Sequence, residues 1–143
     1  NKEEVMMKIY IIISLILIIF PTISNAFEYL VDKNKSTIEF SGIHVGKEFK
    51  GSFSNWEANI FFDESNLKNS KIEVTVEMES GKIGNATYDK TLPTSDWLDI
   101  RNYPKARFTS DNIIKTNINT YAIKGHLELK GKNLPIEFSF TLN

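Results

Sequence analysis

Hydrophobic and polar residues alternate with a period of two along most of this chain. The clearest example is residues 72–79, where apolar side chains fill the even positions and polar side chains fill the odd ones. Such alternation is typical of a strand that buries one face and exposes the other. Residues 121–129 and 134–142 repeat the pattern, and Gly131-Lys132-Asn133 between them predicts a short turn. These two segments should therefore form an antiparallel hairpin.

The alternation changes phase twice in the N-terminal half of the chain. Phe40 and Ile43 have opposite parity, and so do Phe53 and Trp56. A β-bulge or a sharp bend produces such a change inside an extended segment. We therefore expect a strongly curved sheet. The pattern as a whole predicts a single all-β, antiparallel domain, most simply a barrel.

Residues 83–104 are the one long stretch of this domain without alternation. Pro93 and Pro104 punctuate it, and Thr94 or Ser95 could cap one helical turn through Asp96-Trp97-Leu98. Long irregular segments in small domains often carry binding sites. This excursion is therefore a candidate edge of a functional site.

The first 26 residues have the layout of a secretory signal peptide. Lys8 supplies a positive start, residues 9–20 are almost entirely apolar, and small residues precede a cleavage point after Ala26. A membrane anchor is the alternative, but a helix over this run would rise only about 18 Å, against roughly 30 Å of hydrocarbon. We interpret residues 1–26 as upstream residues plus signal peptide, and residues 27–143 as the mature domain. The expected location is periplasmic or secreted, without stable membrane insertion after cleavage.

Composition and charge exclude several classes of function. The formal net charge is −1 and the two signs are interspersed, so a nucleic-acid partner is not expected. Cysteine is absent, and neither His44 nor His126 has a second ligand at metal-binding spacing. Asp96 and Asp99 flank Trp97 and are best explained as solvated loop residues. The sequence predicts no enzyme activity, no catalytic residue and no metal.

Aromatic residues offer a stronger indication than any polar motif. The chain contains ten phenylalanines and two tryptophans, which could fill a packed core or line an apolar cavity. A barrel of about eight strands has room for either side chains or one small ligand. The pattern alone leaves these two alternatives open.

Several short motifs together resemble the YceI-like family. They cover residues 28–142 in the family's order, and the sharpest are Leu92, Ser95-Asp96-Trp97-Leu98-Asp99, Tyr103-Pro104 and Ala106-Arg107-Phe108. The hairpin from Tyr121 to Pro135 is similar to the family's glycine- and proline-containing hairpin.

The resemblance implies an exported, lipocalin-like antiparallel barrel that binds a long apolar lipid, such as a polyisoprenoid or an isoprenoid quinone. It implies no catalytic residue and no other cofactor. Trp97 would then cap the cavity mouth. No motif of the family fixes the contact residues, so the expected lining is chosen by inward phase: Ile38, Phe40, Phe53, Trp56, Ile60, Val74, Val76, Trp97 and Phe108.

Two further expectations accompany this reading. Members of the family continue beyond the proline hairpin, so the barrel is expected to be incomplete at the C-terminus, Asn143. The alternative function is a ligand-free periplasmic interaction module, acting in stress response or beside a membrane redox protein. A homodimer is compatible with either function.

Overall fold

The structure is a computed structural model that describes residues 8–10 and 28–142. Strands dominate it, with one short α-helix and two 3₁₀ turns. In chain order the elements are β1 (Lys8–Tyr10), β2 (Glu28–Tyr29), β3 (Ile38–His44), β4 (Lys47–Phe53), β5 (Trp56–Phe61), η1 (Leu67–Asn69), β6 (Lys71–Glu77), η2 (Met78–Ser80), β7 (Gly81–Lys82), α1 (Ala86–Thr91), β8 (Lys105–Lys115), β9 (Thr120–Leu129) and β10 (Lys132–Thr141).

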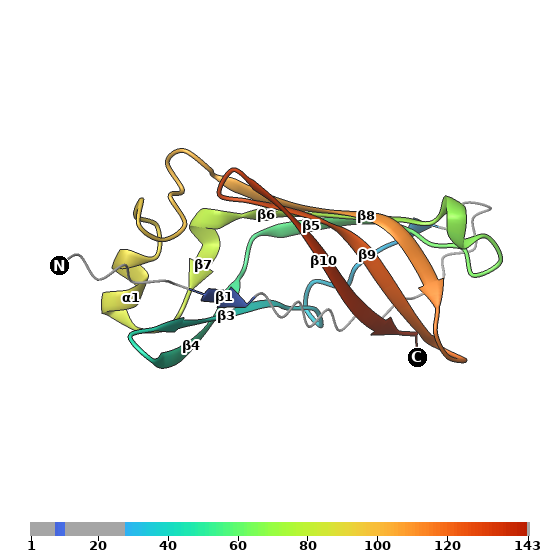
Figure 1. Ribbon diagram of the computed structural model, residues 1–143, viewed down its shortest axis with the longest axis horizontal. Coiled ribbons are helices and arrows are strands. Elements are labelled where there is room, and N and C mark those ends of the chain that lie inside the picture. Colours follow the sequence, from blue (N-terminus) through green and yellow to red (C-terminus); the bar gives the residue numbers. More distant parts are fainter. Residues whose placement is uncertain (1–7, 11–27, 143) are drawn as a thin grey trace.

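The strands form two antiparallel sheets that face each other (Figure 1). The larger sheet has the order β10-β9-β8-β6-β5-β2, and the smaller has the order β1-β3-β4-β7. The core lies between them. The all-β, antiparallel class is therefore confirmed, whereas the described strands make two separate sheets and no closed barrel.

The strand phases confirm the alternation read from the sequence. On β6, Val74 is 4% exposed and Val76 is 9% exposed, while Glu73 and Glu77 lie half-buried on the other face. The β9–β10 hairpin forms as expected, with Leu129 opposite Lys132. Its turn residues are Lys130 and Gly131, both with positive φ, so the tight turn begins one residue earlier than predicted.

The first change of phase was wrongly attributed to a bulge or bend. β3 and β4 pair in an uninterrupted register from Ile38↔Phe53 to His44↔Lys47. Ile43 takes the opposite parity because it points outward, where its side chain is 39% exposed. The structure contains a bulge on β8 instead, between Ser110 and Asn112, which the alternation pattern did not predict.

The second change of phase is a real corner, where the chain passes from the smaller to the larger sheet. Ser80 holds this corner: the Asn55 amide donates to Ser80 Oγ at 3.0 Å, and Ser80 Oγ donates to the Glu77 carbonyl at 2.7 Å. The Glu77 amide in turn donates to the Asn55 carbonyl at 2.9 Å. The crossing from β6 to β7, through η2, is thus tied to the crossing from β4 to β5.

The helix of the 83–104 excursion lies earlier than predicted. Asn85 caps α1 by accepting from the Thr87 and Tyr88 amides at 3.0 and 3.2 Å, and an Asn cap is among the strongest. Residues 94–98 form hydrogen-bonded turns instead of the expected helical turn. They end where Asp99 takes a φ of 50°, which an α-helix cannot continue through.

Among the described residues, no helix is both long enough and apolar enough to cross a membrane. The proposed signal segment lies outside the described residues except for β1, whose backbone pairs with Ser41–Ile43 of β3. The expected cleavage point after Ala26 also lies outside them.

Candidate ligand-binding cavity

A small apolar cavity of about 40 Å³ lies between the two sheets. All of its lining side chains are apolar, and they come from both sheets, from η2 and from the 83–104 excursion. They are Ile38, Phe40, Phe53, Val74, Val76, Met78, Leu98, Ala106, Phe108, Leu127 and Leu129.

Strand register brings the lining of the larger sheet together. Val74 of β6 lies opposite Phe108 of β8, and Phe108 lies opposite Leu127 of β9, so one row of side chains crosses three strands. Because successive residues of a strand point to opposite faces, the row continues two residues along, at Val76 and Ala106. The apolar lining thus follows directly from the alternation in the sequence.

The smaller sheet contributes a pair of packed rings. Phe40 and Phe53 have ring centroids 4.7 Å apart. Gly51 makes this placement possible, because a Cβ at that position would lie 2.4 Å from Phe40 Cζ. Gly125 leaves room for the Phe108 ring in the same way, since a Cβ at Gly125 would lie 2.6 Å from that ring.

The structure gathers six of the nine predicted lining residues around this cavity: Ile38, Phe40, Phe53, Val74, Val76 and Phe108. Trp56 and Ile60 are buried in the same core but are not among its lining. Five lining residues were missed, namely Met78, Leu98, Ala106, Leu127 and Leu129. The inward phase of Leu127 and Leu129 was visible in the sequence, whereas Leu98 needed the path of the excursion.

Trp97 does not line the cavity. It is 6% exposed and lies in a group of rings at one end of the molecule, with centroids 5.2 Å from His44, 5.3 Å from Phe49 and 5.9 Å from Tyr88. We call these four residues the aromatic end cluster. The expectation that Trp97 caps the mouth is replaced by this packing role, because its indole faces β3, β4 and α1.

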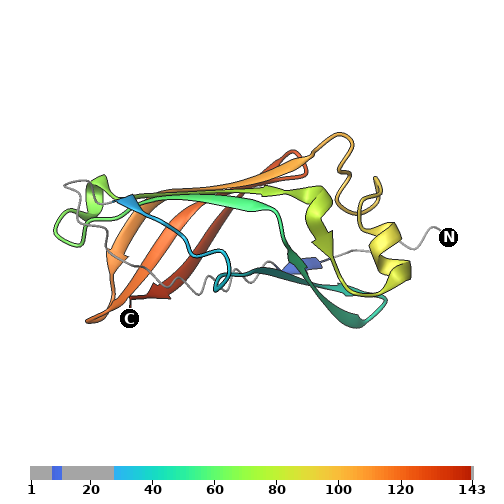
Figure 2. The same ribbon diagram turned by 180° about the vertical axis from the view of Figure 1, so that it is seen from behind.

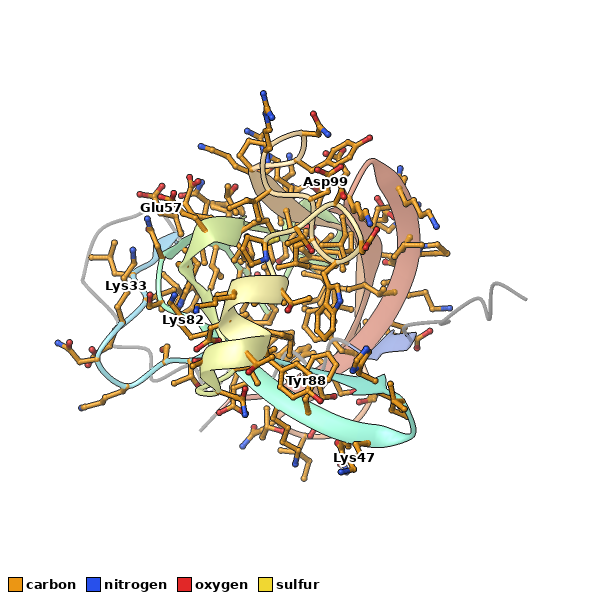
Figure 3. All side chains as sticks on the ribbon, turned by 90° about the vertical axis from the view of Figure 1, so that its left-hand side faces the viewer. Lys33, Lys47, Glu57, Lys82, Tyr88 and Asp99 are labelled. Atoms are coloured by element: carbon orange, nitrogen blue, oxygen red, sulfur yellow. The ribbon has the colours of Figure 1, made fainter. Side chains whose placement is uncertain are left out.

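Figure 3 looks onto this end of the molecule, with Tyr88 near the centre and Lys47 below it. The half-buried His44 ring meets Tyr88 edge-on, with centroids 5.8 Å apart. His44 is therefore part of a packed aromatic group, and its ring has neighbours that stabilise it without any ligand.

A second group of rings lies deeper in the larger sheet, around Tyr121. Tyr121 is 0% exposed, and its ring centroid lies 5.0 Å from that of Phe62 and 5.2 Å from that of Phe140. Its hydroxyl donates to Glu64 Oε1 at 2.7 Å. Burial, followed by the hydrogen bond and the negative charge of Glu64, raises the pKa of Tyr121 to about 12.

The polar side chains offer little reactive chemistry. His126 Nδ1 contacts an Asp111 carboxylate oxygen on the outer face of the larger sheet, where both side chains are about half exposed. Across the described part of the chain, no three His, Asp or Glu side chains are grouped so that they could hold a metal ion. The cavity can therefore bind by apolar contact, and its lining supplies no acid or base.

The inner face of β10 extends the apolar lining toward an open sheet edge. Phe138 has its ring centroid 5.2 Å from that of Phe108, a lining residue of the cavity. Ile136, Phe138 and Phe140 are half-buried, and Leu134 is 40% exposed. β10 is the last strand of its sheet within residues 28–142, and Figure 2 shows it from behind, in dark red.

Comparison with known proteins identifies relatives of this chain. The YceI-like domain model matches residues 29–143. The chain is 32% identical over 121 residues to a UPF0312 protein of Pseudomonas savastanoi pv. phaseolicola, and 32% identical over 124 residues to one of Vibrio campbellii. These matches cover 82% and 85% of this chain, but 63% and 66% of the relatives. The chain thus spans just under two thirds of the length of these curated relatives.

Solved structures agree with the family match. The crystal structure of BcnA from Burkholderia cenocepacia superposes with a TM-score of 0.72 at 27% identity, covering 78% of this chain and 70% of that one. A YCEI protein of Campylobacter jejuni superposes with a TM-score of 0.59 at 26% identity, covering 65% and 54%. The family model, the curated relatives and the structural superpositions together show that this chain belongs to the YceI-like family.

Proposed function

We propose that this protein is an exported binding protein that carries or sequesters an isoprenoid-type lipid in an apolar site between antiparallel sheets, in the manner of a lipocalin-like protein. One observation carries the proposal: the wholly apolar cavity continues through the Phe108–Phe138 contact onto the half-buried inner face of β10. An elongated hydrocarbon gains free energy from every apolar surface that it covers, roughly 25 cal/mol per Å².

The size of the cavity limits how the ligand binds. A volume of about 40 Å³ is well below the roughly 150 Å³ that holds benzene, and below the ~300 Å³ of ordinary ligand pockets. We infer that a long lipid would lie in the trough between cavity and β10, widening the cavity by moving side chains such as Leu129. Leu129 is only half-buried, so its displacement costs little packing.

The location and chemistry proposed for this protein follow from the sequence. The signal-peptide layout of residues 1–26 supports a location in the periplasm or outside the cell. The lipid is its partner, and the lining offers no group for acid–base or nucleophilic catalysis. We therefore propose a binding role without enzyme activity.

Native mass spectrometry of protein recovered after export tests the proposal. We expect an added apolar mass of several hundred daltons that organic extraction removes. Ala106→Leu would add three carbon atoms to the cavity lining and lower lipid occupancy, because it fills the space that the ligand needs. If overpacking prevents folding, Val76→Ile makes a smaller addition at the same place.

Ala58→Leu is the matched control. Ala58 lies opposite Val74 and packs against the core, but it is not part of the cavity lining. Occupancy should be unchanged in this variant. A uniformly ligand-free wild type would contradict the proposal and favour the ligand-free interaction module. Equal lipid occupancy in the wild type and all variants would show that the lipid does not occupy this cavity.

A further inference from the structure

The turn between β3 and β4 has an unusual residue at its tip. Val45 and Gly46 have φ values of 49° and 71°, the left-handed pair of a type I′ turn, which favours Asn, Asp or Gly. A β-branched residue in this region is a true outlier, because its side chain crowds the backbone. Val45 is nevertheless there, and it is 76% exposed to solvent.

The other hairpin with this geometry shows what a soluble turn uses. Lys130 and Gly131, between β9 and β10, have φ values of 47° and 71°. There the first position holds a long, unbranched and charged side chain. At Val45 both the backbone conformation and the exposure to water disfavour the residue, and replacement by Asn would relieve both. Strain that is retained at one exposed position is a reason to look for function there.

The surroundings of Val45 indicate the kind of partner. Ile43, two residues earlier on the outward face of β3, is also exposed, and Lys47 follows directly after the turn. Lys47 and Lys82 both lie at the end shown in Figure 3, and neither has an ion-pair partner within 4.0 Å among residues 28–142.

Acidic groups at this end are partly engaged. Asp99 accepts two hydrogen bonds of 3.1 Å from Asn102, and Asp89 accepts the Ile83 amide at 2.6 Å. Glu48 follows Lys47 on β4, lies opposite Ile43 in the β3–β4 ladder and remains exposed. The β3–β4 tip therefore combines the exposed aliphatic side chain of Val45 with the lysine Lys47, which has no ion-pair partner among residues 28–142. The aromatic end cluster lies behind them.

We propose that the β3–β4 tip docks onto an anionic lipid surface, with Val45 and Ile43 entering the headgroup region and Lys47 beside the lipid phosphates. Shallow apolar insertion flanked by lysine is how peripheral proteins bind membranes. Two aliphatic side chains are too small for the core of a stable protein interface, whereas they suffice for reversible membrane contact. This inference goes beyond the proposed function, because it does not depend on what the cavity holds.

The test measures partition of the exported protein, its N-terminus established by sequencing, onto vesicles of phosphatidylcholine with and without phosphatidylglycerol. Val45→Asn should weaken partition about tenfold, the ratio that corresponds to burial of one valine side chain. The same variant should melt at an equal or higher temperature, since Asn tolerates the left-handed region. Lys47→Gln should weaken binding only to the anionic vesicles, and added salt should erase that difference.

Ile118→Asn is the matched control. Ile118 is 80% exposed and lies between β8 and β9, in the turn at the opposite end of the molecule (Figure 1). Its partition should equal that of the wild type. Absence of wild-type binding, no loss in Val45→Asn, or equal losses in both Asn variants would overturn the proposal, and capture of a protein through Val45 without vesicle binding would replace it.

The bound-lipid mass of Val45→Asn separates this inference from the proposed function. We expect an unchanged ligand in a variant that no longer partitions onto vesicles. A ligand-free wild type that still partitions through Val45 would contradict the lipid-binding function and leave the membrane contact standing.

Discussion

Tyr121 and Glu64 are 57 residues apart in sequence, yet the Tyr121 hydroxyl donates to Glu64 Oε1 at 2.7 Å. This hydrogen bond joins β9 to the loop that follows β5. The strands β9 and β5 are not neighbours in the sheet. Tyr121 is fully buried while its hydroxyl reaches an acidic side chain near the surface. Because of this pair, we expect the free energy of unfolding to decrease at alkaline pH.

We expect stability to fall as the pH rises from 10 to 12. The pKa of Tyr121 is raised from 10.0 to about 12 in the folded state, so the native state retains a proton that the unfolded chain loses. The stabilisation is complete below pH 10 and lost as the pH passes the folded pKa. Two pH units correspond to about 2–3 kcal/mol, measured by urea denaturation across this range.

Tyr121→Phe is the control for this titration. It removes the ionisable group and leaves the aromatic packing against Phe62 and Phe140 in place. The alkaline loss of stability should be smaller by the contribution of Tyr121. Identical pH profiles for the two proteins would show that the Tyr121–Glu64 pair is not coupled to folding.

Val76→Asp should destabilise the protein by several kcal/mol. Val76 is 9% exposed within the cavity lining, so the substitution buries a carboxylate without a partner. Glu77→Gln, the next residue, removes only a partly exposed ion pair of 3.0 Å with Lys105, worth about 1 kcal/mol or less. Chemical denaturation of both variants compares them, and similar losses would refute the phase assigned to β6.

Trp97→Ala should lower stability without emptying the ligand site. Its indole packs against Phe49, His44 and Tyr88 rather than in the cavity, and loss of a buried aromatic costs about 3–5 kcal/mol. Thermal melting and bound-lipid stoichiometry are measured on the same sample. Full occupancy in the remaining folded fraction is expected, and a stable but ligand-free variant would restore Trp97 as a lid.

Gly125→Ala should be more harmful than an ordinary glycine substitution. A Cβ at Gly125 would lie 2.4 Å from the Thr109 carbonyl oxygen and 2.6 Å from the Phe108 ring, so backbone and core must both shift. We expect a loss of at least 1–3 kcal/mol. Gly84→Ala meets nothing within 4 Å and should lose only about 1 kcal/mol to its positive φ. Urea unfolding of the pair is the measurement, and equal losses would contradict the close packing.

Most of the fold could be predicted because alternation reports directly on burial. The phases of β6, β9 and β10 and their hairpin follow from a period of two, and so do the lining positions Val74, Val76 and Phe108. Ile43 misled the same reasoning, since an apolar residue that faces water looks identical in sequence to a change of phase.

The remaining features depend on long-range packing that a single sequence does not encode locally. The β-bulge at Asp111 of β8 contains no glycine or proline, so the sequence has no local residue that predicts it. The family resemblance implies that Trp97 caps the cavity mouth, and only the positions of β3, β4 and α1 place it in the aromatic end cluster. The sequence pattern favoured Thr94 or Ser95 as the helix cap, whereas Asn85 caps the helix that forms.

The corner held by Ser80 has a mechanical consequence. The chain passes between its two sheets near Asn55 and again near Ser80, and hydrogen bonds fasten these crossings to each other. Two of the four backbone links between the sheets within residues 28–142 are thus fastened to each other, and residues 30–37 and 83–104 form the other two. We expect the three short hydrogen bonds of this corner to keep the two sheets together on this side, so that a guest would enter or leave along β10, the last strand of the larger sheet in that range.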